Sequence, residues 1–330
     1  MPEYLYHLYE TVISTNVPMP GLPPAKKQMA QMRIKVEAPR AGLLPPAGGW
    51  DHQYLSSSDG SPILSYARLV RGFLLREHTV GDFWISGKGH DIICFPRPGT
   101  SPMAIRDTLL SPILTLVFNL RGFDGIHAAT VQIGSGAVAF CGASGQGKST
   151  LAAYFNSLGW PILSDDFLVL ADSDGHITVS RGLPEVRLWP SSYERFAELH
   201  SRPARPDVSS AKLIVDLDVI EDATLPITLQ TIYFLDRGER EAGGGGHEVR
   251  IETLSGRRAF FLLMDQSYRL DLQDHDMLRR QADIFTRIIA QGRVKLLKLD
   301  WGFELLPRAA ELILADCAQD FPSLEISANY

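Results

Sequence analysis

The first third of the chain shows the polar and apolar alternation of short, half-buried strands. Residues 31–37, Gln-Met-Arg-Ile-Lys-Val-Glu, alternate without a break, which is typical of a strand with one face in a core. Prolines and glycines between residues 18 and 49 disfavour long helices there. Further short strands joined by glycine-containing turns are predicted at 62–68, 72–77, 81–86 and 91–95. The pattern therefore predicts a β-rich N-terminal domain over residues 1–121.

An apolar segment connects this domain to the rest of the chain. Ser111-Pro112 has the form of a helix N-cap followed by proline at the first helical position. We expect a helix from Ile113 to Leu120, and a second domain over residues 122–330.

The second domain mixes strand and helix patterns, so the predicted fold class is α/β, or α+β for the whole chain. Residues 128–133 and 137–141 flank a Gly-Ser-Gly turn and predict a hairpin. A helix is expected at about 148–158, followed by a short strand that ends at Ser164. Further strands are expected at 167–171, 176–180, 213–218, 229–235 and 294–299, and helices at 275–291 and 307–318.

A complete phosphate-binding loop lies between the predicted hairpin and the helix. Its residues are Gly142, Ala143, Ser144, Gly145, Gln146, Gly147, Lys148, Ser149 and Thr150, an uninterrupted match to G-x-x-x-x-G-K-[ST]. Such a loop surrounds polyphosphate with backbone N–H groups at the N-terminus of a helix. Lys148 is expected to reach the β- and γ-phosphates, and the Ser149 hydroxyl to bind Mg²⁺. The sequence therefore predicts that the protein binds a nucleoside triphosphate.

Charged residues on either side of the loop are candidates for the chemistry. Asp165-Asp166 follow the predicted short strand, and adjacent carboxylates could divide metal binding and proton acceptance between them. His127 precedes the hairpin, which could bring it beside the phosphates. Glu185 could complete a metal site, and Arg187 could neutralise charge on the transferring group. Without this context, each of these residues would more often be an ordinary surface or turn residue.

Composition narrows the classes of partner. The formal net charge of −6 is opposite to that of most non-specific nucleic-acid binders, so no nucleic-acid partner is expected. No apolar run is expected to reach the ~20 residues of a membrane span, and no signal peptide is recognised, so no membrane association is expected. The three cysteines, Cys94, Cys141 and Cys317, are isolated and are predicted to be buried thiols in a reducing cytoplasm.

The histidine, hairpin, phosphate loop, helix and paired aspartate together resemble the HPr kinase/phosphorylase family. The catalytic domain of that family is related to phosphoenolpyruvate carboxykinase. The resemblance implies that Asp165 is the general base that activates an acceptor hydroxyl and that Asp166 lies by the metal. It also implies that His127 lies near the phosphates, and it matches Glu185-Val186-Arg187 to a second family signature. ATP and Mg²⁺ are the implied cofactors, and a homo-oligomer is compatible with the resemblance.

The chain departs from the family in the second signature, where Arg187-Leu188-Trp189-Pro190 replaces a glycine-rich run. In the family that run supports phosphorolysis and the complex with HPr, so neither is expected here. Arg-Leu-Trp-Pro and the Tyr-rich start of the chain, Tyr4 to Tyr9, are similar to the HPr-kinase-like proteins of lasso-peptide biosynthesis. Those kinases phosphorylate a hydroxyl of the precursor peptide, notably its C-terminal serine.

The sequence thus favours a kinase that acts on a serine of a peptide or small protein. The N-terminal domain and a flexible glycine-rich loop at 241–246 are candidates for holding the peptide. Three alternatives stay open: a nucleotide-dependent ATPase or switch, a small-molecule enzyme related to phosphoenolpyruvate carboxykinase, and a non-catalytic nucleotide-binding partner in a biosynthetic complex. An ATPase of the ABC type would need a signature motif that is not found, and a binding module would have no need of a base.

Overall fold

The structure, a computed structural model, describes residues 3–26, 29–43, 49–55, 59–173, 175–196, 203–207, 210–218, 226–237 and 248–320. These residues form two compact units. The first contains the residues up to Phe123 together with Ser210 and Arg269–Leu272, and the second contains the other described residues. The predicted glycine-rich loop at 241–246 lies outside the described residues.

The first unit is built on an eight-stranded sheet with the order β1-β2-β3-β8-β7-β6-β5-β4. Its strands are β1 (Tyr4–Leu8), β2 (Thr11–Thr15), β3 (Met32–Val36), β4 (His52–Leu55), β5 (Pro62–Leu69), β6 (Gly72–Glu77), β7 (Gly81–Ser86) and β8 (Asp91–Pro96). The alternation that predicted strands at 31–37, 62–68, 72–77, 81–86 and 91–95 is confirmed by β3 and β5 to β8. β2 and β4 have no comparably regular alternation and were not predicted.

The helical segment of this unit begins earlier than the sequence predicts. Ser101 caps α1 (Pro102–Thr108), and its hydroxyl accepts a hydrogen bond from the N–H of Ala104 at 3.1 Å. The segment continues through the π-helical turn η1 (Leu109–Ile113) into α2 (Leu114–Leu120). Ser111, the predicted cap, lies inside this run with a non-helical backbone, φ −157° and ψ 119°. The Ser-Pro signature was therefore assigned to the wrong one of two serine–proline pairs.

This segment also corrects an expectation about apolar length. Over Pro102–Leu120 the chain has a mean hydropathy of 1.3, and by length and composition alone it could cross a membrane. However, 72% of it is buried inside the structure, which is the environment of a helix in a protein core. It is the one such helix among the described residues.

The second unit is built on a nine-stranded mixed sheet. Its main path is β12-β10-β11-β18-β14-β13-β9, and β20 pairs with both β18 and β19. The strands are β9 (Asp124–Ile126), β10 (Ala128–Ile133), β11 (Gly136–Cys141), β12 (Ile162–Ser164), β13 (Leu168–Ser173), β14 (His176–Val179), β18 (Ile227–Asp236), β19 (Val249–Thr253) and β20 (Val294–Leu299). β18 runs parallel to β11 and β20, whereas the remaining pairs are antiparallel.

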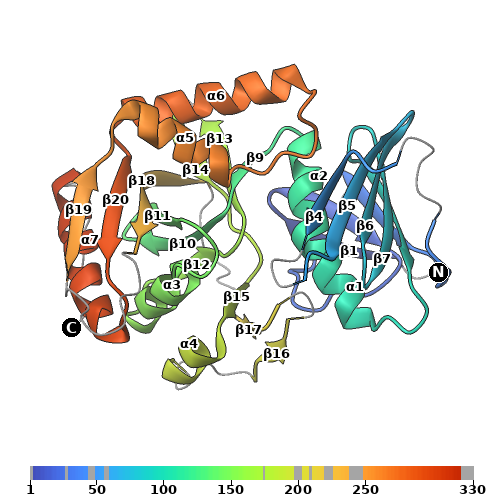
Figure 1. Cartoon of the computed structure of the whole chain (residues 1–330), viewed down its shortest axis with the longest axis horizontal. Coiled ribbons are helices and arrows are strands. Elements are labelled where there is room, and N and C mark those ends of the chain that lie inside the picture. Colours follow the sequence, from blue (N-terminus) through green and yellow to red (C-terminus); the bar gives the residue numbers. More distant parts are fainter. Residues whose placement is uncertain are drawn as a thin grey trace. The chain divides into compact units, whose positions relative to one another are not determined.

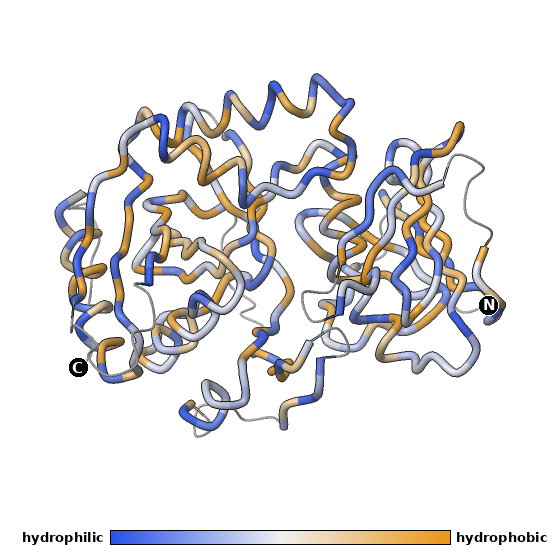
Figure 2. Tube along the Cα trace, viewed as in Figure 1, coloured by the Kyte–Doolittle hydropathy of each residue, from blue (hydrophilic) through white to orange (hydrophobic). Residues whose placement is uncertain are grey.

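Helices cover both faces of this sheet, as Figure 1 shows. The helices of this unit are α3 (Lys148–Ser157), α4 (Pro190–Arg195), α5 (Gly256–Gln266), α6 (His275–Ala290) and α7 (Leu306–Asp320). Val138 and Phe140 of β11 pack in one core with α3 and α7, while Ala137 and Ala139 pack in the other with α5 and α6. A central strand buried on both faces explains why β11 is apolar throughout. In Figure 2, α6 alternates between hydrophobic and hydrophilic residues, as a helix with one buried face does.

A small third sheet with the order β15-β17-β16 completes the second unit. Its strands are β15 (Glu185–Leu188), β16 (Arg205–Pro206) and β17 (Leu213–Asp216). The predicted fold class is confirmed in its coarse form, since the chain mixes helices with large sheets. The predicted hairpin of β10 and β11, the helix α3 and the strand β12 are all present at the expected positions. All three cysteines are buried thiols and none of them forms a disulfide, as predicted.

Phe140 is expected to be a major determinant of stability in the second unit. It is fully buried, and its ring stacks on those of Phe155 and Tyr233 at 5.6 and 6.4 Å between centroids. Phe140→Ala should lower the free energy of unfolding by about 3–5 kcal/mol, because it leaves a cavity between packed rings. Chemical denaturation followed by circular dichroism measures this change. Phe261→Ala, at a side chain that is 62% exposed, is the matched control; an equal loss in both variants would contradict the assignment.

Candidate active site

The phosphate loop joins β11 to α3, and glycines give it its shape. Gly147 immediately precedes α3 with φ +90°, and a Cβ at this position would lie 2.5 Å from Nη2 of Arg237. Gly142 has φ +143°, and a Cβ there would lie 2.4 Å from Oε1 of Gln146. Residues other than glycine rarely adopt such backbone angles. Backbone conformation is therefore the main requirement for glycine at these two positions, because the closest atoms that a Cβ would meet are the ends of flexible side chains.

Lys148 is the first residue of α3, and its amine is held inside the loop. Its Nζ donates hydrogen bonds to the carbonyl oxygens of Gly142 at 2.8 Å and Ala143 at 3.2 Å. Burial lowers the pKa of the Lys148 amine, and the nearby charges of Asp165 and Asp166 partly oppose this shift. A cationic group at the N-terminus of a helix, surrounded by loop backbone, suits the binding of phosphate.

Asp165 follows β12 and is 4% exposed. The Ser149 hydroxyl donates to its Oδ1 at 2.9 Å, and the backbone N–H of Arg187 donates to its Oδ2 at 2.9 Å. Burial raises the pKa of this carboxyl, and the neighbouring charge of Asp166 raises it further, against the effect of the hydrogen bonds. The second aspartate of the pair does not share these contacts.

Asp166 has a left-handed backbone with φ +67°, and its carboxylate has its own set of partners. Its Oδ2 lies 3.0 Å from Nη1 of Arg187, and its Oδ1 lies 3.6 Å from Nε2 of His127. Burial alone would raise the pKa of Asp166. The contact with His127 and the charges of Arg187 and Lys212 outweigh that effect and hold the pKa well below its usual range. Asp166 is therefore ionised at neutral pH.

His127 is held beside Asp166 by contacts with the last residue of α5 and with the segment that follows it. Its backbone N–H donates to the carbonyl of Gln266 at 2.7 Å, and its ring lies 6.2 Å from that of Tyr268. The Tyr268 hydroxyl donates to the backbone carbonyl of Asp166 at 2.9 Å. Tyr268 was not predicted as a site residue. A single tyrosine after a helix forms no motif, so the local sequence does not indicate a role at the site.

Arg187 on β15 is buried and is the centre of an ionic cluster. Besides Asp166, its guanidinium lies 3.5 Å from Glu185 and 3.8 Å from Asp207. Although burial alone would lower the pKa of Arg187, the carboxylates of Asp166, Glu185 and Asp207 raise it above its ordinary value. This cation therefore remains charged and balances several buried carboxylates.

Glu185 does not have the surroundings expected of a metal ligand. It is buried, and its Oε2 lies 2.8 Å from Nη2 of Arg205, so its carboxylate pairs with two arginines. Within the described part of the chain, no group of three or more His, Cys, Asp or Glu side chains is arranged to hold a metal ion. The predicted metal role of Glu185 therefore finds no support in its contacts, which are those of a structural ion pair.

A small cavity of about 20 Å³ lies where the loop meets these residues. Beyond the loop residues themselves, its walls include Asp166, Arg187, Trp189 and Lys212. Lys212 lies just before β17, and its charge lowers the pKa of both Asp165 and Asp166. The sequence gives no signal for Lys212, because it reaches the site only through the pairing of β17 with β15.

The arrangement is suited to binding a metal–polyphosphate complex. The loop backbone and Lys148 supply donors for phosphate oxygens. The Ser149 hydroxyl and the Asp165 carboxylate lie 2.9 Å apart. Both are hard oxygen ligands, and Mg²⁺ usually binds one or two such ligands from a protein. Asp166, beside this pair, is ionised and able to accept a proton.

Comparisons with known proteins add little to this picture. No protein-family model matches the chain, and no curated protein matches it. Among solved structures, the HPr(Ser) kinase/phosphatase from Coxiella burnetii is similar over 59% of this chain and 97% of its own, with 11% sequence identity and a TM-score of 0.29. A likeness at this level establishes neither the fold nor the function of this chain.

The raised pKa of Asp165 predicts how stability depends on pH. The folded state binds a proton at this carboxyl more tightly than the unfolded chain does, so its contribution to stability is present at low pH. That contribution is lost as pH rises from the unfolded pKa of about 4 through the higher folded pKa. Asp165→Asn cannot ionise, and its amide can still donate to Ser149 and accept from Arg187. The variant should therefore gain stability relative to wild type between pH 4 and pH 7.

Thermal unfolding at pH 4, 5, 6 and 7 measures this difference. The control is Asp276→Asn, at a side chain that is 92% exposed, for which the difference from wild type should stay nearly constant. A melting temperature of Asp165→Asn that falls relative to wild type as pH rises would contradict the account of this carboxyl.

Proposed function

We propose that the protein is an ATP- and Mg²⁺-dependent kinase that transfers a phosphoryl group to a serine hydroxyl of a peptide or small protein. One observation carries the proposal: the loop serine Ser149 is hydrogen-bonded to Asp165, and the adjacent, ionised Asp166 lies between His127 and Arg187. The phosphate loop, two potential metal ligands, a carboxylate base and several cations therefore lie next to one another. Phosphoryl transfer depends chiefly on positioning and on the stabilisation of charge, which such a group of residues can supply.

The first step is binding of the phosphates. The loop N–H groups and Lys148 would hold the β- and γ-phosphate oxygens, while Ser149 and Asp165 would hold Mg²⁺. When bound, Mg²⁺ would neutralise charge on the phosphate oxygens and orient them. The hydrogen bond from the backbone of Arg187 keeps the Asp165 carboxylate turned toward Ser149.

Asp166 is the better candidate for the base, although the resemblance assigns that role to Asp165. Both oxygens of Asp165 already accept hydrogen bonds, and the residue is buried. The Asp166 side chain is 19% exposed and borders the cavity at the loop. Because its pKa is low, we expect Asp166 to accept the proton as the phosphoryl group transfers, when the acceptor hydroxyl becomes more acidic. We therefore assign proton acceptance to Asp166 and the metal side to Asp165.

The cations around Asp166 would act on the transferring group. Arg187, Lys212 and Lys148 all border the small cavity, and charge that spreads over the phosphoryl oxygens in the transition state is stabilised by such groups. His127 and Arg187 contact different oxygens of the Asp166 carboxylate: His127 is near Oδ1, and Arg187 is near Oδ2. It orients that carboxylate and adds positive charge when protonated.

The identity of the acceptor is inferred from the sequence resemblance. We propose a lasso-peptide precursor with a C-terminal serine as the substrate class, and the β-rich first unit as the part that holds the peptide. The alternative of a non-catalytic nucleotide-binding partner is less favoured, because such a protein gains nothing from an ionised Asp166 held by His127 and Arg187. A nucleotide-dependent ATPase would use the same loop with water as the acceptor.

Asp166→Asn is expected to separate binding from transfer. It should leave the affinity for Mg·ATP within a few-fold of wild type and lower the rate of transfer by about 10²–10⁴-fold, the usual contribution of a positioned base. Synthetic peptides that end in serine are the probes, and intact-mass spectrometry detects the added phosphoryl group. The same peptides ending in alanine are the matched control.

Asp165→Asn provides the contrast, because it should raise the Mg²⁺ concentration needed for half-maximal transfer. Transfer by Asp166→Asn at the wild-type rate would remove Asp166 as the base. A phosphoryl group on the alanine-ended peptides would show that the terminal serine is not the acceptor, and hydrolysis of ATP without any peptide product would favour the ATPase alternative.

A further inference from the structure

A second cavity, of about 240 Å³, borders the phosphate loop and does not include the aspartates in its wall. Its wall includes Gly145, Gly147 and Thr150 from the loop and the first turn of α3. These three residues and Trp189 also line the small cavity next to Asp166. The two cavities are therefore adjacent along the loop, and a ligand with its phosphates in the loop can extend into the larger one.

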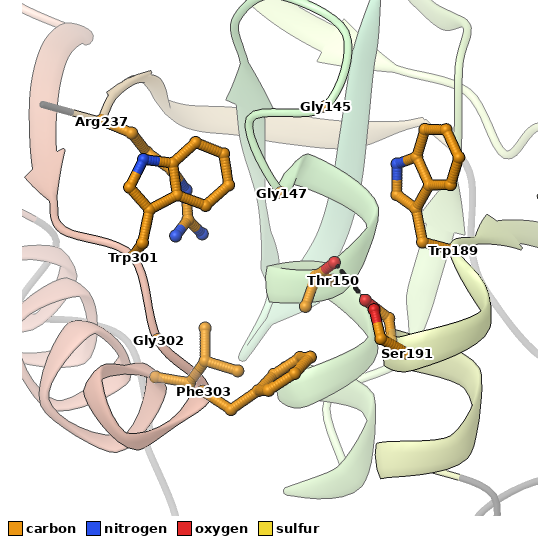
Figure 3. Close-up of a pocket in the computed structure, with 11 residues that line it drawn as sticks. Gly145, Gly147, Thr150, Trp189, Ser191, Arg237, Trp301, Gly302 and Phe303 are labelled. Atoms are coloured by element: carbon orange, nitrogen blue, oxygen red, sulfur yellow. Dashed lines mark hydrogen bonds between the residues drawn. The ribbon is translucent and has the colours of Figure 1, made fainter. Parts of the chain in front are cut away.

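Two tryptophans form the sides of this cavity. Figure 3 shows Trp189 and Trp301 on opposite sides, with the loop and α3 between them. Trp189 precedes α4, and Trp301 lies between β20 and the short helix η3 (Phe303–Leu305). Their side chains are 42% and 41% exposed. Exposed indole rings that face a shared cavity offer flat apolar surfaces to a ligand.

Arg237 ties one of these tryptophans to the phosphate loop. Its guanidinium lies 4.8 Å from the centre of the Trp301 ring. Its Nε donates to the carbonyl of Gln146 in the loop at 2.6 Å, and its Nη1 donates to the carbonyl of Asp300 at 3.1 Å. The Arg237 side chain therefore links the Trp301 ring to the phosphate loop. A ligand that binds both the ring and the loop needs the two to be held in place in this way.

Polar groups in the cavity are few and uncharged apart from Arg237. The Thr150 and Ser192 hydroxyls are 2.9 Å apart and hydrogen-bonded to each other, and the Ser191 hydroxyl lies beside them. Phe303 and Leu306 add apolar surface. The volume is below the ~300–1,000 Å³ that encloses a whole drug-sized ligand, so the cavity suits one part of a nucleotide.

We propose that this cavity binds the purine base of the nucleotide, stacked on Trp301. This inference rests on the proposed function, which supplies the phosphates in the loop. A flat aromatic base matches the indole faces, and base–aromatic stacking needs no particular hydrogen-bond pattern. Asp166, the proposed base for the acceptor hydroxyl, borders the small cavity and not the larger one. The acceptor peptide is therefore expected at the small cavity, which leaves the larger cavity beside Gly145 and Gly147 for the purine base.

Isothermal titration calorimetry with two probes, Mg·ATP and Mg·inorganic triphosphate, tests the proposal. Wild type should bind ATP more tightly than triphosphate. Trp301→Ala should weaken ATP binding by roughly 5- to 150-fold, the range of base–aromatic stacking, and change triphosphate binding by less than twofold. Trp301→Phe should retain most of the ATP affinity, because a phenyl ring still stacks.

Three further variants complete the design. Trp189→Ala repeats the test from the opposite wall without altering the contact of Arg237. Phe261→Ala, at an exposed aromatic residue on α5, is the matched control and should bind both probes as wild type does. Lys148→Ala should weaken both probes, because both carry phosphate.

The possible outcomes distinguish a failure of the proposed base site from a failure of the proposed kinase function. Equal ATP affinity in wild type, Trp301→Ala and Trp189→Ala would overturn the base site and leave nucleotide binding intact. An equal loss of ATP and triphosphate in Trp301→Ala and Trp189→Ala would also overturn it, because the tryptophans would then serve the phosphate end. If wild type binds neither probe, the proposed kinase function itself fails.

Discussion

The buried carboxylate of Asp165 joins three elements that are distant in the sequence. It accepts hydrogen bonds from Ser149 at the start of α3 and from the backbone of Arg187 on β15, while it follows β12 itself. A buried carboxylate without such partners would be costly. This requirement fixes the phosphate loop, the end of β12 and the small third sheet relative to one another. The positions of Asp166 and of the cations around it follow from that arrangement.

The ionic cluster beyond Asp165 shows how the site tolerates many buried charges. Arg187 pairs with Asp166, Glu185 and Asp207, and Arg205 also pairs with Glu185. Paired charges in an interior hold side chains in one geometry, and removal of one partner leaves the other uncompensated. Glu185 therefore acts on the site through Arg187. Its carboxylate helps to keep the guanidinium beside Asp166, which is a positioning role and a different one from metal ligation.

The sequence predicted those parts whose information is local. The hairpin, loop and α3 are consecutive along residues 128–157, so pattern and motif suffice for them. The N-terminus of α1 was missed because Ser101-Pro102 and Ser111-Pro112 carry the same signature and only packing distinguishes them. Lys212, Tyr268 and Trp301 reach the site through the fold and carry no motif. The division between Asp165 and Asp166 depends on the left-handed backbone of Asp166, which a pair of identical residues does not reveal.

In the proposed function, one loop and one aspartate pair form a metal–nucleotide site. The most direct test is a crystal structure of the protein with Mg²⁺ and a non-hydrolysable ATP analogue. We expect phosphate oxygens within hydrogen-bonding distance of Lys148 and Mg²⁺ beside the Ser149 hydroxyl and the Asp165 carboxylate. Asp166 should not contact the metal and should face the terminal phosphate. Phosphates bound away from residues 142–149, or Mg²⁺ coordinated by Glu185 in place of Asp165, would contradict it.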